Sequence, residues 1–177
     1  ALAIEMANTL HLGSGAMIRL DHVPAADEPI AIRLSETTLR GPGPLLELCY
    51  DRLEEPPGAI TIQADGCALV MPRQGALLRL AGPRAPDALL GSIQWIGQGS
   101  LVSPEAAVAQ WVRPDGQVVL LDETAIFMAG LVRSEVVFAG PAETGPEASR
   151  LVRWQVPLRS TNPPGIDPRG LARPRNR

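Results

Sequence analysis

The feature that most constrains this chain is a repeated unit made of two short apolar strand patterns separated by a turn. The clearest copy is residues 59–82, AITIQADGCALVMPRQGALLRLAG. Ile60 and Ile62 alternate with polar residues, a small polar corner follows, and a second apolar stretch closes the unit after Pro72. Alternation with a period of two is typical of a strand that buries one face.

Similar units occur before and after this one, at intervals of 28, 28, 33 and 43 residues. Loops of different length carry the differences between the intervals. Repetition at a period of about 20–50 residues predicts a solenoid, in which each coil buries its apolar columns against the next coil. In register, the opening positions are Ile4, Ile32, Ile60, Ile93 and Val136, and the closing positions are Leu20, Leu48, Leu80, Trp111 and Trp154.

The pattern therefore predicts an all-β solenoid domain of about five coils over residues 1–158, whose fifth and degenerate copy is residues 135–155. A Pro-Asp-Gly turn at 114–116 predicts a hairpin insertion over about 108–123. Residues 159–177 contain five arginines and four prolines with little apolar pattern, which is typical of an extended tail or linker.

The repeated pattern I-x-Φ…L-x-x-P…L-L-x-L resembles the right-handed parallel β-helix of the pectate-lyase-like superfamily over roughly residues 1–155. The resemblance implies a single-stranded, right-handed parallel β-helix. Members of that superfamily include polysaccharide lyases, glycosidases, phage tailspikes, adhesins and repeat segments of large bacterial surface proteins. It thus implies a carbohydrate or protein partner and favours an extracellular or cell-surface location, but it does not separate enzymes from binding proteins.

Composition excludes several functions. All sixteen basic residues are arginine, so lysine-dependent Schiff-base and P-loop chemistry is excluded. A net charge of −3 gives no electrostatic reason to expect nucleic acid as a partner, and no apolar run is long enough for a membrane span. The two cysteines and two histidines lack metal-ligand spacing, so we expect no metal and no cofactor.

Candidate ligand-binding residues are those expected to point outward from successive coils, namely Arg33, Asp65 and Gln94. A lyase of this architecture would need converging carboxylates for calcium, and a glycosidase would need two facing carboxylates. The expected outward corner column holds one carboxylate and selects no catalytic pair; it consists of Thr9, Thr37, Asp65 and Gln98. Glu5 and Arg33 occupy equivalent positions and are expected to form an ion pair between coils.

The remaining residues with reactive or aromatic side chains are expected to be structural. Cys49 and Cys67 are expected to pack as small hydrophobic residues, with a disulfide between them as the alternative in an exported protein. The three tryptophans occupy columns otherwise held by Leu or Ile, which favours core positions over sugar-stacking positions; they are Trp95, Trp111 and Trp154.

A repeat without a convergent catalytic constellation predicts a non-catalytic module of a larger bacterial protein, with a structural or ligand-presenting role. The alternative hypothesis is a polysaccharide lyase or glycoside hydrolase of the same architecture, with its site beside Asp65, Arg33 and Gln94. A third hypothesis is self-association through strand edges at the ends of the solenoid.

Overall fold

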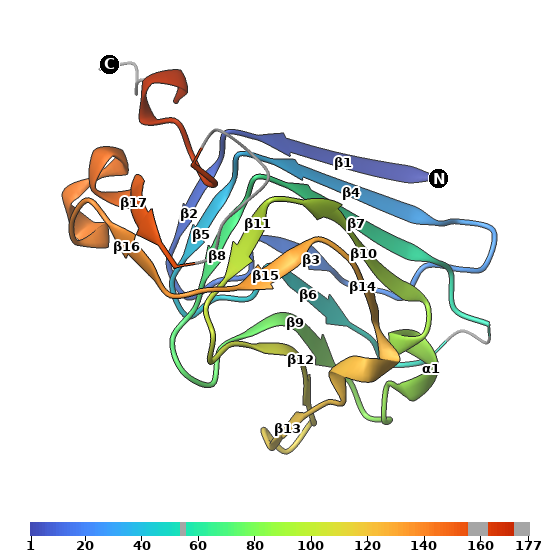
Figure 1. Ribbon diagram of the computed structural model, residues 1–177. Coiled ribbons are helices and arrows are strands. Elements are labelled where there is room, and N and C mark those ends of the chain that lie inside the picture. Colours follow the sequence, from blue (N-terminus) through green and yellow to red (C-terminus); the bar gives the residue numbers. More distant parts are fainter. Residues whose placement is uncertain (54–55, 156–162, 172–177) are drawn as a thin grey trace, which may run out of the picture.

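The computed structural model of the protein describes residues 1–53, 56–155 and 163–171. The chain winds into a parallel β-solenoid of about four turns (Figure 1), which confirms the fold expected from the repeats. Each full coil contributes one strand to each of three stacked sheets, called here sheets A, B and C. None of the helices in the described ranges is long and apolar enough to cross a membrane.

Sheet A holds the longest strands; in spatial order they are β1 (Leu2–Ala7), β4 (Ile30–Ser35), β7 (Ile60–Asp65), β10 (Ile93–Gln98) and β14 (Phe127–Met128). Sheet B contains β2 (Leu10–Leu12), β5 (Thr38–Arg40), β8 (Ala68–Val70), β11 (Ser100–Val102) and β15 (Leu131–Arg133). Sheet C contains β3 (Ile18–Leu20), β6 (Leu46–Cys49), β9 (Ala76–Ala81), β12 (Ala107–Val112) and β13 (Val118–Leu120).

Alternate residues of these strands point into the solenoid, as the period-two pattern predicts. In β7 every second residue is buried and the residues between are partly exposed. Equivalent side chains of successive coils stack into columns, and one column of sheet A runs through Ile32, Ile62 and Trp95. All three side chains are fully buried or nearly so. Burial of each such side chain contributes about 1.5–3 kcal/mol, so these columns hold the coils together.

The corner between sheets A and B repeats the same backbone turn in each full coil. The residue after the sheet A strand has a positive φ in all four coils; these residues are Asn8, Glu36, Gly66 and Gly99. A residue in the left-handed conformation bends the chain sharply, which takes it from sheet A into sheet B, and Gly and Asn adopt this conformation most easily. The expected outward position of Thr37 at this corner was wrong, because its side chain is completely buried.

The register expected between the second and third coils was wrong by two residues. Ile32 pairs with Ile62, and Ile60 pairs with Ile30. A slip of two residues leaves the buried and exposed faces of a strand unchanged, so the apolar pattern alone did not distinguish the two registers. The registers expected between the first and second coils and between the third and fourth are confirmed: Ile4 pairs with Ile32, and Ile93 with Ile60.

The fifth copy expected at 135–155 is not a coil. The chain instead re-enters sheets A and B with the short strands β14 and β15, which pair with β10 and β11. Residues 136–154 form an antiparallel hairpin of β16 (Val136–Phe138) and β17 (Leu151–Trp154) beside sheet B (Figure 1). The short apolar alternation at Val136 predicts a strand, but it does not specify whether the partner strand is parallel or antiparallel.

Short helices occupy the connections between strands. The helix α1 (Asp87–Leu90) precedes β10 and buries Leu89 and Leu90 against the core. β13 pairs antiparallel with β12 and is followed by the 3-10 helix η1 (Glu123–Ala125). The turn of the β16–β17 hairpin carries η2 (Ala142–Thr144) and η3 (Pro146–Ser149).

Residues 163–171, within the range expected to be an extended tail, lie against the corner between sheets A and B. Their backbone N–H groups bond to three successive coils: Gly165 N to Gly66 O at 2.6 Å, Ile166 N to Thr38 Oγ1 at 3.0 Å, and Asp167 N to Asn8 Oδ1 at 2.8 Å. The segment ends in η4 (Pro168–Gly170). Positions 159–162 and 172–177 of the expected tail lie outside the described residues.

Candidate functional site

The outer face of sheet A presents side chains in rows that run from coil to coil, about 4.8 Å apart. Three rows follow from the register, and the residues are exposed or partly exposed throughout. The first row is Ala3, Ala31, Thr61, Gln94 and Phe127; the second is Glu5, Arg33, Gln63 and Ile96; the third is Ala7, Ser35, Asp65 and Gln98.

Glu5 and Arg33 form the predicted ion pair in the second row. The Arg33 Nη1 atom donates to Glu5 Oε1 at 2.8 Å, and both side chains are largely exposed. An exposed pair of this kind contributes about 0–1 kcal/mol, so its main effect is to hold the guanidinium in one orientation on the face.

The Asp65 carboxylate is held by two donors, one in the second row and one in its own row. Gln63 Nε2 donates to Asp65 Oδ2 at 2.9 Å, and the backbone N–H of Gln98 donates to Asp65 Oδ1 at 3.0 Å. Glu5, Arg33, Gln63 and Asp65 together line a shallow hollow of about 280 Å³. The structure thus brings Arg33 and Asp65 to the rim of one hollow.

Gln94 lies on the same face but outside that hollow. Its neighbours in the first row are Thr61 and Phe127. Phe127 belongs to the edge strand β14 and is 62% exposed. The face therefore carries an exposed aromatic ring next to an amide, with a network of carboxylates, amides and a guanidinium beside them.

Phe127 was not predicted as a site residue, although the sequence contained a signal for it. Ile126 lies 33 residues after Ile93, the same interval that separates Ile60 from Ile93. Extending that interval would have placed a strand of sheet A at Phe127 and Met128. The opening positions Ile32, Ile60 and Ile93, taken in register, placed Arg33 and Gln94 in one row. That placement was wrong because of the two-residue slip: Arg33 pairs with Gln63, and Gln94 pairs with Thr61.

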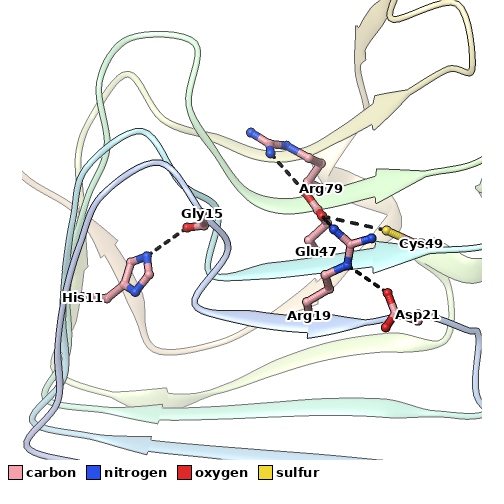
Figure 2. Close-up of polar contacts among 7 residues, drawn as sticks. All are labelled: His11, Gly15, Arg19, Asp21, Glu47, Cys49 and Arg79. Atoms are coloured by element: carbon pink, nitrogen blue, oxygen red, sulfur yellow. Dashed lines mark hydrogen bonds and ion pairs between the residues drawn. The ribbon is translucent and has the colours of Figure 1, made fainter.

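A second polar cluster lies on sheet C, where Glu47 stands between two arginines of neighbouring coils (Figure 2). Arg19 Nη1 and Arg79 Nη1 each lie 3.1 Å from one of its carboxylate oxygens. Arg19 also bonds to Asp21 at 2.8 Å. Each charged residue of this ladder pairs with a residue of its own coil or of a neighbouring coil. The ladder therefore stabilises the register of sheet C and leaves none of its charges free for a ligand.

Both cysteines are free thiols. Cys67 is completely buried in the core, and its burial raises the pKa of its thiol to about 11. Cys49 is partly buried beside Glu47, and burial is also the main cause that raises its pKa (Figure 2). A thiol with a raised pKa is a poor nucleophile at neutral pH, so neither cysteine has the environment of a catalytic residue.

The tryptophans divide into two groups. Trp95 and Trp111 are buried, as predicted, and Trp111 Nε1 donates to Gly82 O at 2.8 Å. Trp154 is only partly buried and belongs to the β16–β17 hairpin, outside the three stacked sheets. His11 bonds to the Gly15 carbonyl within the corner of the first coil at 2.9 Å (Figure 2). Among the residues that the structure describes, no group of three His, Cys, Asp or Glu side chains could hold a metal ion.

Comparisons with protein-family models, with curated proteins and with solved structures gave no match for this chain. A parallel β-solenoid is a scaffold for enzymes and for binding proteins alike. The side chains on its faces, and not the fold, must therefore decide between these functions.

Proposed function

We propose that the chain is a non-catalytic, ligand-presenting module whose outer face of sheet A binds carbohydrate. The observation that carries the proposal is the exposed ring of Phe127 next to Gln94 in the first row. The C–H face of a sugar ring can cover an aromatic ring, while neighbouring amides and carboxylates bind its hydroxyl groups. The resemblance to bacterial β-helix proteins supports a place for this module in a larger bacterial surface protein.

The arrangement of carboxylates favours binding over hydrolysis. Glu5 and Asp65 are two coils and one row apart on sheet A, and the coil between them carries Arg33. A glycosidase holds its two catalytic carboxyl groups facing each other across the sugar. Here the Glu5 carboxylate is already bonded to Arg33, and the Asp65 carboxylate to Gln63.

Native gel electrophoresis of the whole chain through gels that contain galacturonan, xylan or a glucan tests the proposal. We expect at least one polysaccharide to retard the protein, and Phe127→Ala to abolish most of the retardation. Val118→Ala is the matched control, because Val118 is 53% exposed on sheet C rather than sheet A. Equal mobility in all gels would contradict carbohydrate binding.

The same polysaccharides, incubated with the protein with and without calcium, test the enzymatic alternative. A binding module releases no reducing ends and no unsaturated products. Turnover that is abolished by Asp65→Ala would overturn the non-catalytic role and would place a catalytic carboxylate at the hollow beside Arg33.

A further inference from the structure

A second hollow lies away from sheet A, between the ends of the sheet B strands and the β16–β17 hairpin. Its volume is about 520 Å³, within the range of small-molecule sites. One wall comes from the solenoid at Val70 and Pro104, and the other from the hairpin at Val136 and Trp154. We call it the hairpin hollow.

The hairpin wall is fixed to the solenoid by specific contacts. Arg40 of β5 donates to the carbonyl oxygens of Gly140 and Ala148 at 2.8 and 3.3 Å, and its guanidinium lies over the Phe138 ring. Ser134 Oγ accepts the backbone N–H of Gln155 at 3.1 Å. These contacts hold the hairpin against the solenoid, which makes the site pre-formed.

Half of the residues that line the hollow are apolar, and two opposite charges line it as well. These are Glu135 and Arg153. The Glu135 carboxylate accepts a hydrogen bond from Gln155 Nε2 at 2.6 Å. Among the described residues, Arg153 forms no ion pair, with Glu135 or with any other carboxylate. Arg153 is exposed and is the one cationic residue of this lining, and a guanidinium is a ready binding group for a carboxylate.

We propose that the hairpin hollow binds a small amphipathic carboxylate, whose charged group pairs with Arg153 while its apolar body covers Trp154, Val136 and Val70. The indole face and the valines supply the contact area, and the guanidinium supplies orientation and charge selectivity. The hairpin hollow is separate from the outer face of sheet A, so this proposal does not depend on whether sheet A binds carbohydrate.

Three probes distinguish the contribution of the charge from that of the apolar body: phenylacetate, its neutral analogue phenylacetamide, and acetate. We expect saturable binding of phenylacetate by the whole chain, measured by calorimetry and by tryptophan fluorescence. Phenylacetamide should bind about tenfold more weakly because it lacks the charge, and acetate should show no saturation because it lacks the apolar body. The fluorescence change should come from Trp154, since Trp95 and Trp111 are buried.

Variants assign the binding to the hollow. Arg153→Gln should weaken phenylacetate binding about tenfold and leave phenylacetamide binding unchanged. Arg150→Gln is the matched control, because Arg150 is an exposed arginine of the same hairpin that does not line the hollow. Trp154→Phe should remove the fluorescence change while calorimetry still reports binding.

Several results would overturn the proposal: no saturable binding of phenylacetate, equal affinity for the amide, or unchanged affinity in Arg153→Gln. A fluorescence change that persists in Trp154→Phe would place the ligand elsewhere and would also overturn it. Phe127→Ala should leave phenylacetate binding intact, so failure at this site is distinguishable from failure of carbohydrate binding on sheet A.

Discussion

Arg40 and Phe138 join the second coil of the solenoid to a hairpin almost a hundred residues later in the chain. The Arg40 guanidinium lies 4.3 Å from the centre of the Phe138 ring, and its Nη1 atom also donates to two hairpin carbonyl oxygens. A planar cation can stack on a ring and donate hydrogen bonds at its edge, which an apolar side chain cannot do.

Arg40→Met should therefore loosen the hairpin without unfolding the coils. Charged hydrogen bonds of this kind contribute about 1.5–3 kcal/mol each, so the amides of Ala139 and Gly140 should exchange at least tenfold faster with deuterium. The amide of Ile62 serves as the internal control, because it lies in the central strand of sheet A. Unchanged exchange at Ala139 and Gly140 would show that Arg40 does not hold the hairpin.

Gly66→Ala should destabilise the protein through backbone conformation alone. Gly66 has φ of 61°, and a Cβ added there would meet no atom within 4 Å. A left-handed alanine costs about 1 kcal/mol, which urea denaturation would detect. Gly15→Ala is the matched control, since Gly15 also has open space but does not have a left-handed φ. Equal stabilities of the two variants would contradict the strain argument.

Ser100→Ala should leave two buried backbone groups without a partner. Ser100 Oγ accepts the N–H of Cys67 at 3.1 Å and donates to the carbonyl of Ala64 at 2.9 Å, and its side chain is fully buried. We expect a loss of about 2 kcal/mol in the free energy of unfolding. The exposed Ser14→Ala substitution should change stability by less than about 0.5 kcal/mol. A loss no larger than that of the control would mean that the bridge is energetically neutral.

Cys67 should make stability depend on pH in the alkaline range. Burial raises the pKa of its thiol to about 11, so the unfolded state releases this proton at a lower pH than the folded state does. The stabilisation is complete below the unfolded pKa of about 8.5, and it is lost as the pH rises towards 11. It amounts to roughly 3 kcal/mol.

Between pH 8 and 11, the free energy of unfolding should thus fall less steeply with pH for Cys67→Ala than for the original protein. A residual slope should remain at the upper end, because burial also raises the pKa of Tyr50 to about 12. The same dependence of the free energy of unfolding on pH in both proteins would show that the pKa of Cys67 does not differ between the folded and unfolded states.

Most of the fold could be predicted from the sequence, because stacked columns of Ile, Leu and Val require one buried side chain at every second position. The closing column was predicted in full register for four coils: Leu20, Leu48, Leu80 and Trp111. The predicted opening column was two residues off at the third coil, where Ile32 pairs with Ile62 and not with Ile60. The two extra residues lie in the preceding loop, and a shift of two residues does not change which face of the strand is buried.

That slip also decided what could be predicted of the candidate site. Arg33 and Asp65 meet at one hollow because each lies on the outer face of adjacent coils. Gln94 was expected in the row of Arg33, but it belongs to the row of Phe127. The hairpin hollow could not be predicted, because it depends on how residues 136–154 dock on the solenoid, and periodicity carries no information about docking.

The contact between Asn8 and Asp167 has a consequence for the order of folding. Two hydrogen bonds join these residues across 159 positions of sequence: Asn8 Nδ2 to Asp167 O and Asp167 N to Asn8 Oδ1. Each coil needs only its predecessor, so during synthesis the stack can grow while the chain is still emerging from the ribosome. The segment that fastens the first three coils together is synthesised after all of them. Assembly of this molecule should therefore end with a closing step that returns to its first coil.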